Sequence, residues 1–79
     1  MSIKQFLILT ALNRSNTKMV LRSDDCYHIW NIYGAVEEIK LSRSYGTKLI
    51  SAGFINQKDG KITLRGQTWI RDQYESLKS

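Results

Sequence analysis

The segment from Leu49 to Ile70 constrains the fold more than any other part of the chain. Gly53 follows the apolar pair Leu49-Ile50, a pattern typical of a helix that ends in a left-handed glycine. Asp59-Gly60 is a strong hairpin signal, because a type I′ turn requires positive φ at both of its central residues. The segment therefore predicts a helix end, a hairpin and the start of a last helix. The hairpin strands are expected at Phe54–Gln57 and Lys61–Leu64.

Hydrophobic spacing predicts the remaining elements. Cys26, Ile29, Trp30 and Tyr33 recur at i, i+3, i+4 and i+7, which is the buried stripe of a helix. Ser23 with two following acids is a favourable start for that helix. The predicted elements outside the hairpin are a helix at Ile3–Asn13, a strand at Lys18–Leu21, and helices at Ser23–Tyr33, Ala35–Ala52 and Arg65–Leu77. We expect a single domain over residues 1–79.

The register of the third helix has two interpretations. Gly34 is the turn before a long helix in the first, and Lys40-Leu41 is the turn before a helix that begins near Ser42 in the second. Gly46 costs about 1 kcal/mol relative to alanine inside a helix, so it indicates either close packing or a helix break. The first interpretation is preferred, because Ser23–Tyr33 already supplies a full second helix.

The order from Leu49-Ile50 through Gly53, Asp59-Gly60 and Ile62-Thr63-Leu64 to Trp69-Ile70 resembles the end of winged helix-turn-helix DNA-binding domains. The MarR-like and small phage or plasmid regulators are the most similar branches. The resemblance implies a mainly α fold with a small antiparallel β-wing, in the order α-β-α-α-β-β-α. It also implies a transcriptional regulator that reads double-stranded DNA with its third helix and its β-wing.

Charge favours a polyanionic partner. Twelve Lys and Arg against seven Asp and Glu give a net charge of +5, which suits DNA, RNA or an anionic membrane surface. One side of the third helix carries basic and hydroxyl side chains without an acid, as a DNA groove requires, although a solvent-exposed stripe gives the same pattern. The predicted DNA-binding residues are Lys40, Arg43, Ser44, Thr47, Lys48 and Ser51 on that helix, with Lys58 and Lys61 beside the hairpin tip.

The first and last helices suggest a subunit interface. The first helix is apolar nearly all round, which indicates burial on more than one side. A homodimer and a monomer are both compatible with this pattern. The residues expected at a dimer interface are Leu9, Leu12, Trp69, Tyr74 and Leu77.

Catalysis has little support in the sequence. His28 and Cys26 are the only residues of their types and are expected to point apart on a helix, so neither an enzyme, a metal site nor a cofactor is predicted. The apolar run Phe6–Leu12 is far shorter than the roughly 20 residues that span a bilayer. We therefore expect a cytoplasmic protein, associated with the nucleoid or in a host cytoplasm. Two rival functions are a protein-interaction module, for polymerase or a host nucleoprotein complex, and an RNA- or nucleoprotein-binding factor.

Overall fold

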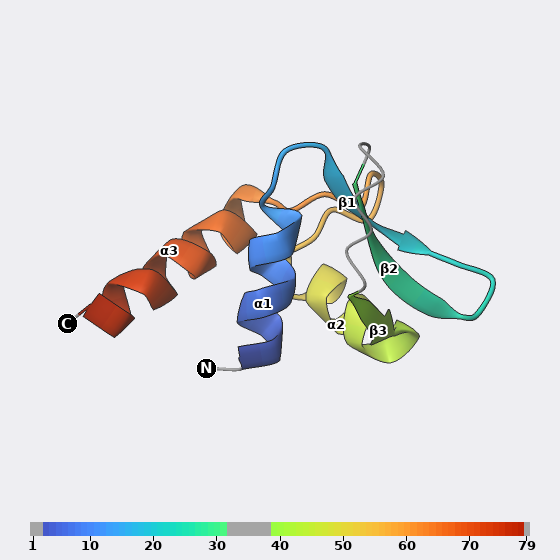
Figure 1. The fold of residues 1–79 in the computed structure, drawn as a ribbon, viewed down its shortest axis with the longest axis horizontal. Helices are drawn as coiled ribbons and strands as arrows, with labels where there is room; N and C mark the ends of the chain where they lie inside the picture. Colours follow the sequence, from blue (N-terminus) through green and yellow to red (C-terminus); the bar gives the residue numbers. More distant parts are fainter. Residues whose placement is uncertain (1–2, 32–38, 79) are drawn as a thin grey trace.

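The computed structural model has one helix, then a sheet, then two helices (Figure 1). It describes residues 3–31 and 39–78. The elements are α1 (Ile3–Leu12), β1 (Thr17–Leu21), β2 (Cys26–Asn31), β3 (Lys40–Ser42), α2 (Arg43–Ser51) and α3 (Leu64–Lys78). The predicted winged helix-turn-helix order is therefore wrong. Consecutive strands stand where a second helix was expected.

The three strands form an antiparallel sheet in the order β1-β2-β3. Met19 pairs with Ile29, and Tyr27 pairs with Leu41. Between β1 and β2 the chain reverses in a tight turn, in which the Asp25 N–H donates to the Arg22 carbonyl and Asp25 takes a φ of 63°. The two acids expected to start a helix thus lie in a turn, and Asp25 is in the left-handed conformation that aspartate tolerates.

The helix predicted at Ser23–Tyr33 is wrong over residues 23–31, because this sequence also suits a strand, and residues 32–33 lie outside the described residues. Cys26–Asn31 is rich in aromatic and β-branched side chains, which favour the pleated, half-buried surface of a sheet. Ile29 satisfies the helical stripe and a strand alternation equally well. In the structure, Ile29 pairs with Met19 of β1 and is 3% exposed, so the segment forms a strand and not a helix.

The helix predicted at Ala35–Ala52 is wrong over residues 39–42. Ser42 caps α2 by accepting a hydrogen bond from the Tyr45 N–H, and Lys40–Ser42 is strand β3. The helical part thus matches the second register, and residues 35–38 lie outside the described residues. At the other end, Gly53 has a φ of 84° and its N–H donates to the Ile50 carbonyl, which confirms the predicted glycine stop.

The predicted β-wing is reduced to one bridge, between Ile55 and Ile62. Gly60 takes the expected positive φ, 71°, but its carbonyl accepts a hydrogen bond from the Met19 N–H at 2.8 Å. The turn is therefore packed on the edge of β1 instead of projecting as a wing. The Thr63 hydroxyl accepts a hydrogen bond from the Gly66 N–H, so the chain enters α3 where the second strand was predicted to continue.

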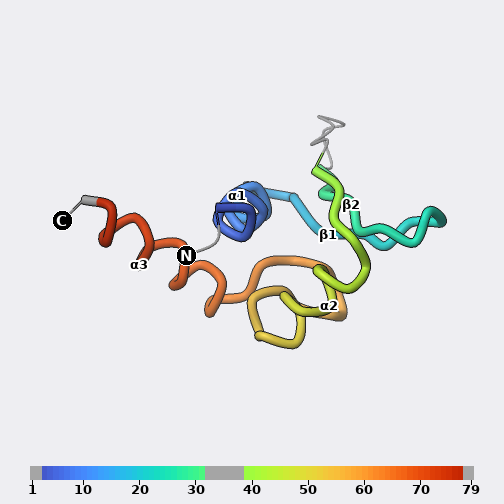
Figure 2. The backbone as a smooth tube through the Cα atoms, turned by 90° about the horizontal axis from the view of Figure 1, so that it is seen from below, coloured from blue at the N-terminus to red at the C-terminus, as the bar shows by residue number. Residues whose placement is uncertain are grey.

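The core lies between the helices and one face of the sheet. Figure 2 shows α1 and α2 on one side of the strands, with α3 extending beyond α1. Figures 1 and 2 both place the end of α3 away from the sheet. The buried apolar residues are Ile8, Leu9, Ala11, Leu12, Met19, Ile29, Leu41, Leu49, Ile55 and Ile70. Leu9 and Leu12 are 0% and 1% exposed, so their expected place at a dimer interface is wrong. Their second buried side is supplied by the chain itself.

The predictions for the first helix, the first strand and the last helix agree with α1, β1 and α3 to within a residue or so. The hydrophobic patterns of β1 and α3 each fit a single period, whereas α1 is apolar nearly all round. None of the helices in the described residues is long and apolar enough to cross a membrane.

Candidate nucleic-acid interface

The face of the sheet opposite the core carries three basic side chains, a histidine, a valine and a tryptophan. Successive side chains of a strand point to opposite faces, so the residues that flank buried Met19 and Ile29 lie together on the other face. The pairing places Lys18 opposite Trp30, and Val20 in one row with His28 and Lys40. We call Lys18, Val20, Arg22, His28, Trp30 and Lys40 the outer sheet face.

Trp30 is the central apolar group of this face. Its side chain remains 37% exposed, although a tryptophan is costly to leave in water. The Lys18 ammonium lies 5.3 Å from the centroid of its ring, within the range of a cation–π contact. Lys18, Val20, Arg22 and Trp30 line one shallow groove. The groove thus offers an aromatic ring beside one cation, Lys18, with a second cation, Arg22, further along the same strand face.

A second groove runs along the edge of β1 and shares Lys18 and Val20 with the first. Its other wall is the turn that contains Asn56, Lys58 and Gly60. The Asn56 side chain accepts a hydrogen bond from the Lys58 N–H, and the Asp59 side chain accepts one from the Lys61 N–H. These bonds fix the turn while leaving Lys58 and Lys61 exposed. Basic side chains therefore continue from the outer sheet face to the turn.

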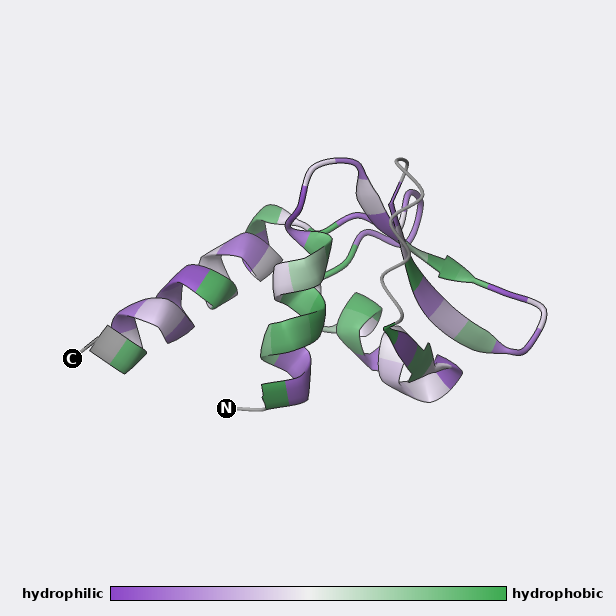
Figure 3. Ribbon diagram, in the orientation of Figure 1, coloured by the Kyte–Doolittle hydropathy of each residue, from purple (hydrophilic) through white to green (hydrophobic). Residues whose placement is uncertain are grey.

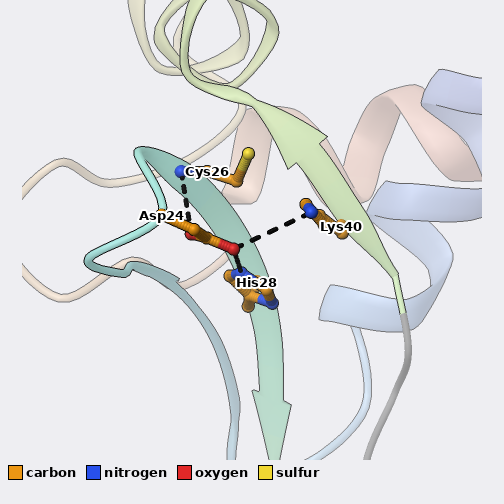
Figure 4. Close-up of polar contacts among 4 residues, drawn as sticks. All are labelled: Asp24, Cys26, His28 and Lys40. Carbon is orange, nitrogen blue, oxygen red and sulfur yellow. Dashed lines mark hydrogen bonds and ion pairs between the residues drawn. The ribbon is translucent and has the colours of Figure 1, made fainter.

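Asp24, in the turn between β1 and β2, contacts His28 and Lys40 of the outer sheet face (Figure 4). Its carboxylate lies 2.9 Å from His28 Nε2 and 3.8 Å from Lys40 Nζ, and it accepts a hydrogen bond from the Cys26 N–H. The pKa of Asp24 is lowered, first by the hydrogen bond from His28 and then by the Cys26 N–H and the charges of His28 and Lys40, while partial desolvation opposes the change. The carboxylate therefore stays ionised and compensates part of the positive charge.

The predicted helix surface exists on a shorter helix. Arg43, Ser44, Thr47, Lys48 and Ser51 are all exposed on α2, while Gly46 and Leu49 of the same helix are buried. Arg43 Nη1, however, lies 3.0 Å from Asp25 Oδ1. The eight predicted DNA-binding residues thus occupy three places: Lys40 on the sheet, five on α2, and Lys58 with Lys61 at the turn.

Sequence reasoning missed Lys18 and Trp30. Trp30 was assigned to a buried helical stripe, which its exposure overturns. A usable signal was present, because Lys18 and Val20 alternate with buried Met19, and His28 and Trp30 flank buried Ile29. Strand alternation, applied to both segments, places these four side chains on one face.

The side chains of this surface supply groups that can bind a ligand. Cys26 and His28, which were expected to point apart, share one face of β2 because they are two residues apart in a strand. Within residues 3–31 and 39–78, no group of three or more His, Cys, Asp or Glu side chains is placed to hold a metal ion. The face offers cations, a ring and hydrogen-bond donors, all suited to a polyanion with planar groups.

Comparisons with known proteins give no assignment: no family model, curated protein or solved structure matches the chain.

Proposed function

We propose that the protein binds single-stranded nucleic acid on the outer sheet face. The observation that carries the proposal is the exposed Trp30 ring, set in a groove with Lys18 and Arg22 on the face that the helices leave uncovered. Trp30 would stack on one base, and Lys18 and Arg22 would contact phosphates. Grooves that combine an aromatic platform with cations along the backbone path are the common solution for single strands.

The charge distribution supports this surface over the α2 surface. Arg43 is engaged by Asp25, which adds a negative charge beside the start of α2 where a phosphate would have to approach. Lys18 and Arg22 lie in a groove lined otherwise by Val20 and Trp30. Among residues 3–31 and 39–78, Asp24 is an acid that contacts this face, and its oxygens already accept from the Cys26 N–H and contact His28 and Lys40.

Duplex DNA binding through α2 is the second candidate. The observation in its favour is the exposed set of hydroxyl side chains with Lys48 on α2. Transcriptional regulation, nucleoid association and the protein-partner alternative remain predictions from the sequence. The winged-helix scaffold on which they were based is absent from the described residues.

Fluorescence anisotropy across salt concentrations separates the two surfaces. The probes are an oligo(dT) of about 15 nucleotides, which fits common site sizes for single strands, and a duplex of the same length. Lys18→Ala with Arg22→Ala should reduce the magnitude of the salt slope for the single strand by roughly 1.4, that is about 0.7 for each lost phosphate contact. The matched control, Arg43→Ala with Lys48→Ala, removes the same charge from α2 and should leave the slope unchanged. The opposite pattern, with duplex preferred, would transfer the function to α2.

Trp30 provides an independent optical test. Trp69→Phe leaves Trp30 as the only tryptophan, so stacking of a base on it should quench the remaining fluorescence. Trp30→Ala should weaken binding by roughly 5- to 100-fold, the value of one stacked base, and Trp30→Phe should retain most of the affinity. Binding that is equally tight in Trp30→Ala contradicts the proposal.

A further inference from the structure

The groove along the edge of β1 is continuous with the groove that contains Trp30. Lys18 and Val20 line both, so the two hollows adjoin across one strand. We call the groove between β1 and the turn at residues 56–60 the edge groove. Its volume is about 400 Å³, within the range of about 300–1,000 Å³ that is common for ligand pockets. A chain that leaves the Trp30 ring across β1 therefore enters the edge groove.

The walls of the edge groove differ in polarity. Leu21, which is 43% exposed, contributes apolar surface together with the half-buried side chains of Tyr27 and Ile50. The turn supplies the polar wall, and Figure 3 shows this hydrophilic turn beside the hydrophobic end of β1. A planar group with polar edges suits such a groove, because its faces pack on apolar side chains while its edges meet hydrogen-bonding groups.

The edge groove is held open by backbone hydrogen bonds. The Met19 N–H donates to the Gly60 carbonyl at 2.8 Å, and the Gly60 N–H donates to the Asn56 carbonyl at 2.8 Å. A ligand therefore meets a formed site and does not have to order the turn. The same contact interrupts the edge of β1 at Met19, so an extended peptide cannot pair with consecutive residues of the strand. This favours a nucleotide over an added peptide strand.

The charges of the edge groove favour a phosphate. Lys18 stands on the β1 wall and Lys58 on the turn wall. Among residues 3–31 and 39–78, neither lysine forms an ion pair with a carboxylate. Asp59 also lines the groove, and its side chain accepts a hydrogen bond from the Lys61 N–H. Two cations on facing walls thus outnumber one acid whose carboxylate already has a donor.

We propose that the edge groove binds a second nucleotide of the same single strand. Its base would lie between the apolar wall and the turn, and the phosphate that joins it to the nucleotide on Trp30 would lie between Lys18 and Lys58. The inference rests on the proposed function, because the first nucleotide is the one stacked on Trp30. It also gives a reason for a preference for single strands, since only an unpaired base can turn into such a groove.

The salt dependence of binding tests the role of Lys58. With oligo(dT) of about 15 nucleotides, Lys58→Ala should reduce the magnitude of the salt slope by roughly 0.7, the value of one phosphate contact. Lys58→Arg keeps the charge and should keep the slope. Arg71→Ala removes the same charge from α3, whose end lies away from the sheet (Figures 1 and 2), and should leave the slope unchanged.

Thiol protection tests the position of the strand without relying on affinity. Cys26 is the only cysteine, so Cys26→Ser combined with Lys58→Cys or with Arg71→Cys carries a single thiol. Saturating oligo(dT) should slow alkylation by N-ethylmaleimide several-fold at position 58 and leave the rate unchanged at position 71. Circular dichroism verifies that each variant is folded.

The outcomes separate this inference from the proposed function. A salt slope that Lys58→Ala leaves unaltered, or a thiol at position 58 that reacts equally fast with and without oligo(dT), overturns the inference. If oligo(dT) still quenches Trp30 in the Trp69→Phe protein, the proposed function stands in that case. Absence of both quenching and binding overturns the two together.

Discussion

Gly46 of α2 lies directly against the ring of Tyr27 on β2: a Cβ at this position would be 2.2 Å from Tyr27 Cδ2. This contact fixes how closely α2 approaches the sheet. It also resolves the meaning of a glycine inside a helix, because close packing, and not a helix break, accounts for it.

Gly46→Ala is therefore expected to destabilise the fold, although alanine is the better helix former by about 1 kcal/mol. The nearest atoms include Tyr27 Cγ at 3.0 Å, close to the backbone of β2, so the ring cannot simply swing away. We expect a net loss of roughly 1–3 kcal/mol from overpacking, measured by urea unfolding. In a Tyr27→Val background the same substitution should be neutral or stabilising. A loss of equal size in both backgrounds would show that the ring is not responsible.

Gly60→Ala should be more damaging than Gly53→Ala. Both glycines have positive φ, but a Cβ on Gly60 would meet the Met19 backbone oxygen at 2.2 Å, whereas one on Gly53 meets the flexible Arg65 side chain at 3.2 Å. Asparagine tolerates positive φ, so Gly53→Asn should recover stability and Gly60→Asn should not. Thermal unfolding of the four variants tests this order, and a Gly60→Asn protein as stable as the native one would contradict the contact with β1.

Thr63→Ala should remove two hydrogen bonds that join the end of α2 to the start of α3. The Thr63 hydroxyl accepts from the Gly66 N–H and donates to the Gly53 carbonyl. Loss of such a cap costs about 1–2 kcal/mol, which corresponds to a fall in Tm of roughly 4–16 °C for a domain of this size. Thr63→Ser keeps the hydroxyl and should retain most of the stability. Equal losses in the two variants would assign the effect to the methyl group.

Asp24 should contribute to the acid limb of the stability curve. Its pKa is lowered in the folded protein, chiefly by the hydrogen bond from His28. The contribution is complete above the unfolded pKa, about 4, and is lost as pH falls through the lower folded value. Asp24→Asn should therefore flatten the loss of stability below about pH 4, as followed by urea unfolding from pH 7 to pH 2.5. Asp72→Asn, on α3 away from this turn, is the matched charge control, and an identical change in both variants would deny Asp24 a specific role.

The sequence predicted those elements whose local pattern has one solution. The α3 stripe, the β1 alternation and the Gly53 stop each fit a single period or a single turn geometry. The segment Cys26–Asn31 does not, because Ile29 is buried in a helix and in a strand alike. The choice depends on pairing with β1, a contact between distant residues that no local pattern contains.

The candidate site was only partly predicted, again because the period of Cys26–Asn31 was ambiguous. The exposed α2 residues follow from helical spacing, which survived the change of fold. Trp30 was expected in the core because the wrong period was applied to β2, and with it the basic groove around Lys18 and Arg22 was missed. Arg43 was expected to be free for DNA, but the turn that replaced the second helix brings Asp25 to it.

The hydrogen bond from the Met19 N–H to the Gly60 carbonyl has a consequence for how the protein behaves at high concentration. An uncovered outer strand offers a row of unpaired amides onto which another chain can add, and this is a common route to edge-to-edge aggregation. Here the turn occupies the middle of that row on β1, and β3 at the other border of the sheet is only three residues long. Loosening the turn, as in Gly60→Ala, would therefore expose a template for intermolecular strand addition, and such a variant should lose solubility before it loses its helices.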